Sequence, residues 1–159
     1  PVSGSMAVVA ETILKKQTAS ARWRIGGLSL LNTDIDEKIK SGKLLECLGF
    51  KFGLHFGWGG AANEIQDLGS SWCGAWCVRL NDGPEHIRYV SQISLISQQS
   101  KADFSRSGAR SSSKAKCRGW NNFKLRSEIL DSHFVLDDSL ILQLSIEAWP
   151  LNPKVTRLY

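Results

Sequence analysis

The sequence feature that most constrains the fold is a strict two-residue alternation between positions 50 and 58. Large apolar side chains occupy every second position, and glycine, lysine or histidine lies between them. A β-strand repeats its side-chain direction every two residues, so this run predicts a strand with one face in a core. The alternating apolar residues are Phe50, Phe52, Leu54, Phe56 and Trp58.

Four further runs share this period and predict further strands, at residues 20–25, 72–78, 87–95 and 134–149. Glycine, asparagine, aspartate and proline separate the runs, as in turns, and one short helical turn fits residues 125–130. Strands joined by turns, without long helices between them, predict an all-β fold. We expect an antiparallel β-sandwich of about eight strands with at most one short helical turn.

One domain accounts for the whole chain, because 159 residues suffice for a single substantial core. We interpret residues 1–5 as a remnant of an expression vector and residues 6–19 as an N-terminal extension. The domain itself is expected to cover residues 20–149, followed by a C-terminal tail at 150–159. Serine, glycine and basic residues dominate the stretch 105–119, which is predicted to be a mobile loop.

The cysteine pattern and the absence of targeting signals bear on location. No apolar run reaches the roughly 20 residues of a membrane-spanning helix, and the N-terminus does not resemble a signal peptide. The spacing of the cysteines fits no zinc motif, so we expect buried free thiols in a reducing compartment, the cytoplasm or nucleus. Neither a metal, a cofactor nor a membrane is expected. The four cysteines are Cys47, Cys73, Cys77 and Cys117.

Two motifs stand near the ends of the expected domain. The first is WRIGGLS at residues 23–29, and the second is GWNNF at residues 119–123, followed by residues 130–140. They resemble the MATH (TRAF-like) family, whose opening strand reads W-x-I-x-x-F-S, with Leu28 here in place of the aromatic residue, and whose closing pattern reads G-W-x-x-F … L … F-L-x-D-D-x-L. The resemblance spans most of the chain. It implies an eight-stranded antiparallel sandwich with a shallow groove for extended peptides.

The resemblance also implies which residues line that groove. Aromatic residues on a central strand do so in ubiquitin-ligase adaptors of the speckle-type POZ class, and Trp72 and Trp76 match those positions. Because Ser91 stands where a phenylalanine is expected and Gly119 replaces an acidic residue, the family's known consensus peptides are not expected as ligands. The strand pattern alone leaves open whether the two tryptophans face the core or a groove. The peptide-binding residues inferred in this way are Trp72, Trp76, Tyr89, Ser91 and Trp120.

The net charge of +5 is concentrated in one segment, residues 101–118, where six basic residues accompany one acidic residue. Three interpretations remain open: a solvated loop, a charged rim that captures acidic or phosphorylated peptides, and a nucleic-acid contact. Only Phe104 interleaves with the charges, which disfavours nucleic acid. The rim would consist of Arg106, Arg110, Lys114, Lys116 and Arg118.

No catalytic motif stands out in the sequence. The cysteines lie in or beside expected strands, and no recognisable nucleophile motif pairs them with His55, His86 or His133. Asp137 and Asp138 are adjacent, so in a strand they point to opposite faces and cannot act as a pair. We therefore expect no enzyme activity.

The leading hypothesis is a protein–protein interaction module that binds short extended segments of partner proteins. By the resemblance, it would recruit them to an activity elsewhere in the parent chain, such as ubiquitin ligation or signalling. The alternative is a structural self-assembly domain, although no heptad pattern precedes Ser20 to indicate a homo-oligomer. A nucleic-acid binder that uses the basic segment is the third hypothesis.

Overall fold

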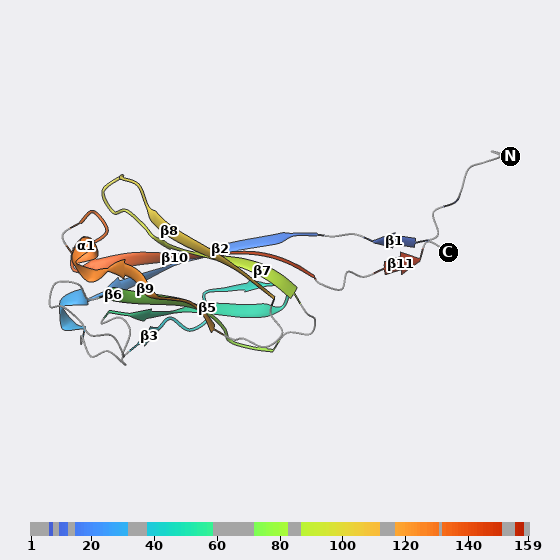
Figure 1. Ribbon diagram of the computed structural model, residues 1–159, viewed down its shortest axis with the longest axis horizontal. Coiled ribbons are helices and arrows are strands. Elements are labelled where there is room, and N and C mark those ends of the chain that lie inside the picture. The colour runs from blue at the N-terminus through green and yellow to red at the C-terminus, as the bar shows by residue number, and fades with distance from the viewer. Residues whose placement is uncertain are drawn as a thin grey trace.

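The computed structural model describes residues 7, 10–12, 15–31, 38–58, 72–82, 87–111, 117–130, 132–150 and 155–157. Strands dominate, with one 3-10 turn at Leu28–Leu30 and one short helix, α1 (Arg126–Leu130) (Figure 1). The strands are β1 (Ala10–Thr12), β2 (Gln17–Gly26), β3 (Ile39–Lys40), β4 (Leu45–Cys47), β5 (Phe50–Gly57), β6 (Trp72–Arg79), β7 (Ile87–Leu95), β8 (Phe104–Ser111), β9 (Cys117–Leu125), β10 (Ser139–Pro150) and β11 (Val155–Arg157).

Two antiparallel sheets form a sandwich, which confirms the expected fold class. We call the sheet with strand order β2-β10-β7-β8 the β2 sheet. The other, the β5 sheet, has the order β3-β5-β6-β9, and β4 also pairs with β5. Strands β8 and β9 end their sheets on the same side of the sandwich, where they are edge strands (Figure 1).

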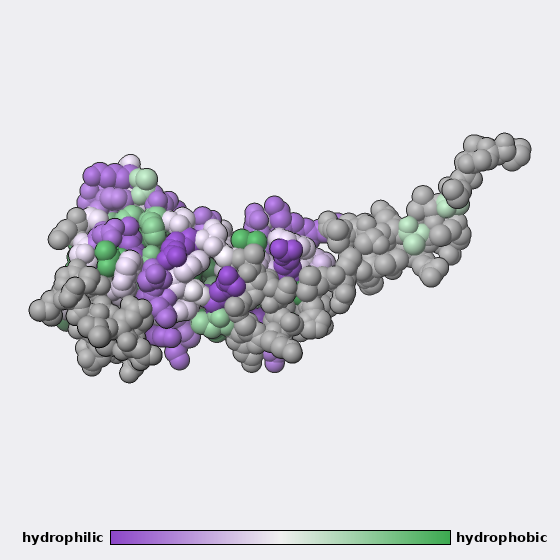
Figure 2. All heavy atoms as spheres, in the orientation of Figure 1, coloured by the Kyte–Doolittle hydropathy of each residue, from purple (hydrophilic) through white to green (hydrophobic). Residues whose placement is uncertain are grey.

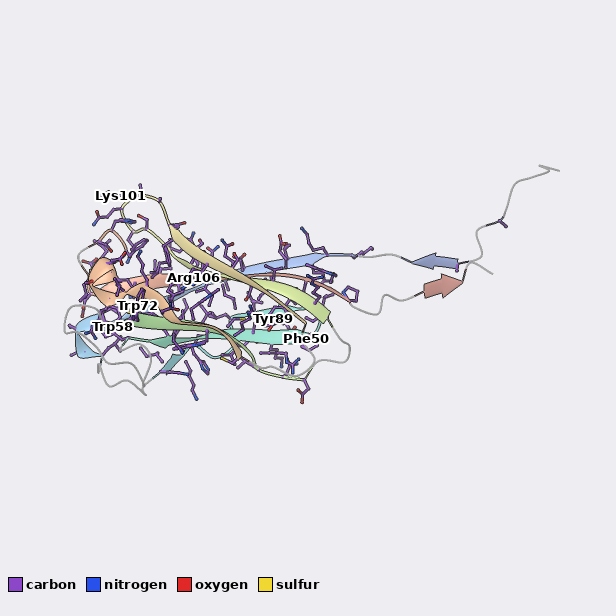
Figure 3. The ribbon with its side chains drawn as sticks, in the orientation of Figure 1. Phe50, Trp58, Trp72, Tyr89, Lys101 and Arg106 are labelled. Carbon is purple, nitrogen blue, oxygen red and sulfur yellow. The ribbon has the colours of Figure 1, made fainter. Side chains whose placement is uncertain are left out.

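The inner faces of the two sheets carry the core. Alternate residues of β5 and β10 are completely buried, as the two-residue period predicted, and burial of this apolar surface drives the packing. The rings of Phe52 and Tyr89 meet edge to face across the sheets, with centroids 5.2 Å apart (Figure 3 labels Tyr89). The core includes Phe52, Leu54, Phe56, Ile93, Leu95, Leu140, Leu142 and Leu144.

The last predicted strand begins later than its pattern suggested. The alternation starts at Phe134, but β10 starts at Ser139 because the chain turns just before it. Asp137 and Asp138 have φ angles of 51° and 55°, and Leu136 exchanges backbone hydrogen bonds with Ser139 across this turn. The helical turn expected at 125–130 is present as α1.

The stretch 105–119 was expected to be a loop, and this prediction was wrong for residues 105–111 and 117–119; residues 112–116 lie outside the described residues. Residues 105–111 continue β8, whose backbone pairs with β7 from Leu95↔Phe104 to Arg88↔Ser111, and residues 117–119 begin β9. An edge strand can be held by backbone pairing on one side, so it does not need a continuous apolar face. Lys114 and Lys116 lie outside the described residues.

Short strands near the two chain ends pair with each other, with Glu11 opposite Thr156. This β1–β11 pair lies beyond one end of the sandwich (Figure 1). β2 already begins at Gln17, within the expected N-terminal extension, and its register with β10 runs from Gln17↔Ala148 to Gly26↔Ser139. In the part of the chain that is described, no helix is long and apolar enough to cross a membrane.

Candidate functional site

The two candidate tryptophans of β6 lie on the outer face of the β5 sheet. Three alternate residues of β6 face the core and are fully buried: Cys73, Ala75 and Cys77. Because side chains alternate along a strand, Trp72 and Trp76 share the opposite face, away from the core. The structure thus decides the question that the pattern left open: both tryptophans lie on the outer face of the sheet and not in the core between the sheets.

Trp76 lies flat against its own sheet on a floor of glycines. A methyl group at Gly74 would collide with the indole ring, and one at Gly57 would lie 3.3 Å from it. Gly57 and Gly74 are opposite each other on β5 and β6, so two adjacent strands leave the space that the ring fills. The ammonium group of Lys38 lies 4.2 Å from the ring centroid on the outer face. Only 8 % of Trp76 remains exposed.

A shallow hollow of about 470 Å³ adjoins Trp76 at the edge strand β9. The register of β6 and β9 shifts between Cys73 and Ala75, and past this irregularity Gly119 lies opposite Trp76. Only glycine fits there, since a methyl group would collide with the backbone of Ala75 and Trp76. The lining residues are Trp76, Cys117, Arg118, Gly119, Trp120 and Asn121.

Trp120 lines the same hollow, but its ring packs from the other side of the sheet. It is opposite the inward-facing Ala75, and its centroid is 6.1 Å from that of the buried Phe123. The guanidinium carbon of Arg106 lies 4.9 Å from the Trp120 ring centroid. Trp120 is therefore half-buried between the sheets and is covered by a cation.

Tyr89 and Ser91 do not reach this hollow. Both lie on the inner face of β7, where 1 % of Tyr89 and 2 % of Ser91 are exposed. The structure thus corrects their expected place in a groove: the alternation of β7 directs both side chains into the core. Of the predicted contact residues, Trp76 and Trp120 meet at the hollow, and Trp72 lies on the same outer face, farther along β6.

Three cations occupy the open side of the sandwich between β8 and β9, and we call Arg106, Arg118 and Lys124 the basic seam. Arg106 Nη1 donates a hydrogen bond to the carbonyl oxygen of Asn122 at 2.7 Å. Arg118 Nε would lie 3.0 Å from a methyl group at Gly108, so its side chain passes over that glycine. Figure 3 labels Arg106 beside β8, and Figure 2 shows hydrophilic and hydrophobic residues interspersed on this side.

Lys124 is a member of the seam that sequence reasoning missed, because it follows the segment singled out by charge. Its ammonium group lies 4.2 Å from the Phe104 ring centroid and 3.2 Å from Glu128 Oε2. Alternation along β9 could have indicated it, because Arg118 and Lys124 are an even number of residues apart and so fall on one face of that strand. Of the other predicted rim residues, Arg110 pairs through its backbone with Tyr89 on β7, while Lys114 and Lys116 fall outside the described residues.

Two described thiols near the site, Cys73 and Cys77, have raised pKa values. Burial raises the pKa of the Cys73 thiol to about 12, against a weaker opposing effect of Arg126. Burial also raises the pKa of Cys77 to about 12, with a smaller contribution from Cys117. Thiols with such pKa values are poor nucleophiles at neutral pH. Within the described ranges, no three His, Cys, Asp or Glu side chains are grouped so that they could hold a metal ion.

No protein-family model matches the sequence, and no curated protein matches it either. The resemblance to the MATH family therefore rests on the two terminal motifs.

Proposed function

We propose that this chain is a protein–protein interaction module that binds a short extended segment of a partner at the outer face of the β5 sheet. The observation that carries the proposal is the position of Trp76. A large aromatic side chain lies outside the core, on a glycine floor, beside a hollow at an edge strand. Tryptophans that border a surface hollow are typical anchors of protein contacts, and 8 % of Trp76 remains exposed here.

Strand β9 supplies the second element of the proposed site. As an edge strand it has backbone N–H and C=O groups on one side that no neighbouring strand pairs within the described residues. A peptide that adds to this edge gains main-chain hydrogen bonds, and its side chains point alternately to the two faces. Gly119 and Trp76 line the same hollow at this edge, where an outward-facing ligand side chain would be placed.

The expected affinity is micromolar, because a short flexible segment loses conformational entropy on binding and a shallow hollow buries little area. By the resemblance to MATH domains, binding would recruit the partner to an activity elsewhere in a parent protein, such as ubiquitin ligation or signalling. The chain itself would perform no chemistry. A cytoplasmic or nuclear location belongs to the same proposal.

Selection of short peptides from a displayed library tests the proposal. The selection is run with the wild type, Trp76→Ala and the matched control Trp149→Ala. Trp149 lies on β10 of the other sheet with Arg88 5.8 Å from its ring centroid, so it has the same kind of cation contact. Peptides should enrich on the wild type and on Trp149→Ala, and they should be lost on Trp76→Ala.

Folding of both variants is measured first by thermal melting, since loss of a buried tryptophan can cost about 3–5 kcal/mol. If Trp76→Ala does not fold, Trp76→Phe replaces it, because a smaller ring still covers the glycines. The proposal fails if nothing enriches on the wild type, or if a folded Trp76 variant retains the same peptides. Self-assembly, detected as a concentration-dependent mass in light scattering, would then be the leading function.

A further inference from the structure

Two arginines of the basic seam have no carboxylate partner among the residues that the structure describes. Arg106 covers the Trp120 ring and uses one nitrogen for the Asn122 carbonyl oxygen. Arg118 lies over Gly108 and lines the hollow. A guanidinium group carries five N–H donors, so each retains donors for a further acceptor. Lys124, the third cation, is already paired with Glu128.

Three contacts between the two edge strands repeat at two-residue steps along β8. Phe104 faces Lys124, Arg106 faces Trp120, and Gly108 faces Arg118. Two residues of a strand span about 6.6–6.8 Å, so the β8 position that Arg106 occupies and the one that Arg118 covers, Gly108, are one such step apart. An extended peptide repeats its side-chain direction at the same interval.

We propose that the segment bound at β9 carries acidic residues at alternate positions, i and i+2, which pair with Arg118 and Arg106. This inference rests on the proposed function, because it names the chemistry of the segment bound at that site. A strand added to β9 directs every second side chain toward the seam between the sheets. The residues between them point to the outer face, toward the hollow and Trp76. The ligand pattern is therefore acidic–apolar–acidic.

The chemistry of the seam favours a carboxylate ligand over a nucleic acid. Guanidinium groups bind carboxylates in a planar, two-hydrogen-bond arrangement, which suits side chains presented singly from a strand. Single-stranded nucleic acids need free aromatic faces on which bases stack. The aromatic rings beside the seam are already covered by cations: Lys124 Nζ lies 4.2 Å from the Phe104 ring centroid, and the guanidinium carbon of Arg106 lies 4.9 Å from that of Trp120.

The test begins with the sequences that the displayed library yields. Peptides retained by the wild type should contain two Asp or Glu residues two positions apart with an apolar residue between them. One such peptide is synthesised with a fluorescent label, together with a counterpart in which Asn or Gln replaces the acidic residues. Fluorescence anisotropy then measures both against the wild type, Arg106→Gln and Arg118→Gln.

Each arginine variant should bind the acidic peptide about tenfold or more weakly, the usual effect of removing a hydrogen bond to a charged group. Arg88→Gln is the matched control, since Arg88 covers Trp149 on the other sheet, and it should bind like the wild type. Arg118→Lys keeps the charge but loses the planar fork, so its affinity should be intermediate. Thermal melting confirms that the variants fold.

The two proposals fail in different ways. If enriched peptides need Trp76 but lack paired acidic residues, and both arginine variants bind them normally, the acidic ligand is excluded while the binding module stands. If no peptide enriches, both proposals are overturned. If unlabelled single-stranded DNA displaces the peptide, and Arg106→Gln and Arg118→Gln lose DNA binding, the seam is a nucleic-acid contact and the acidic-peptide inference is wrong.

Discussion

The two sheets bury similar inner faces, but their outer faces differ. On the β5 sheet, the glycines at positions 57 and 74 make room for the Trp76 ring. On the β2 sheet, small polar side chains bond to one another, as between the hydroxyl groups of Ser20 and Ser145, 3.0 Å apart. A hollow of about 300 Å³ on that face is lined by Thr18, Ser20, Val90, Gln92, Ser107, Ser145, Ile146 and Glu147.

This difference shows that the outer faces follow separate requirements. On the outer face of the β2 sheet, serine and glutamine side chains satisfy one another through hydrogen bonds. The Trp76 ring lies outside the cluster between the sheets, but it packs on the glycines of the β5 sheet and only 8 % of the residue is exposed. Under the proposed function, this ring is the anchor of the bound segment. Four experiments can break or sharpen this comparison.

The largest expected effect is a difference in thiol reactivity between the outer and inner faces of the β5 sheet. Iodoacetamide at pH 8 should modify the exposed Cys117 at least about a thousandfold faster than Cys73 or Cys77, since a thiol of pKa about 12 is almost never a thiolate at that pH. Mass spectrometry of peptides from a labelling time course measures the rates. In denaturant all four cysteines should react. Rapid labelling of Cys77 in the folded state would mean that the β5 sheet is open on both faces.

The next largest effect should be the loss of stability caused by a methyl group at the contact between β6 and β9. Gly119→Ala forces a side chain into the backbone of Ala75 and Trp76, and such overpacking should lower the free energy of unfolding by about 3 kcal/mol. Urea denaturation measures it. Gly26→Ala in the β2 sheet is the control, because its nearest neighbour is the flexible end of Arg24 at 3.3 Å, and it should change stability by less than about 0.5 kcal/mol. Equal losses of stability in Gly119→Ala and Gly26→Ala would show that the two sheets do not differ in how closely these glycines are packed.

Replacing a glycine beneath the Trp76 ring should have a moderate effect on stability. Gly74→Ala displaces the Trp76 ring, which should cost about 2 kcal/mol and shift tryptophan fluorescence to longer wavelength as the indole meets water. Ser145→Ala on the other outer face removes one exposed and one partly buried hydrogen bond and should cost less, about 1 kcal/mol. An unchanged spectrum in Gly74→Ala would show that the ring does not depend on that glycine.

The smallest effect concerns pH. Burial, followed by the charges of Lys40 and Lys38, lowers the pKa of His55, which lies on the outer face of the β5 sheet. The unfolded chain then binds the proton more readily than the folded protein, so stability falls as the pH drops below about 6.5, the usual pKa of histidine. His55→Gln should reduce this loss between pH 7 and 5, as followed by urea denaturation at each pH. An identical pH profile in the variant would exclude the effect.

Much of the sandwich could be predicted from sequence because its central strands alternate in hydrophobicity. The patterns at 50–58, 72–78 and 87–95 correspond closely to β5, β6 and β7. Strand β8 was missed because its inner positions include Arg106 and Gly108, so its apolar period is lost. Backbone pairing with β7 holds β8 in the sheet, although the pattern of its side chains does not indicate a strand.

Part of the candidate site was also encoded in that alternation. The period of β7 places Tyr89 and Ser91 on the side of Ile87 and Ile93, and the structure buries both. Their inferred place in the groove came from the family resemblance instead. Local periodicity was therefore the better guide to which way these two side chains point.

The sequence by itself determined that the chain forms strands and that Trp72 and Trp76 point the same way, because both follow from the two-residue repeat. It could not determine which face of the sheet they occupy, since a core and a binding surface can both be apolar. The tertiary structure decided this through contacts distant in sequence: Gly57 of β5 and Gly119 of β9 flank Trp76, and the second sheet covers the opposite side of β6.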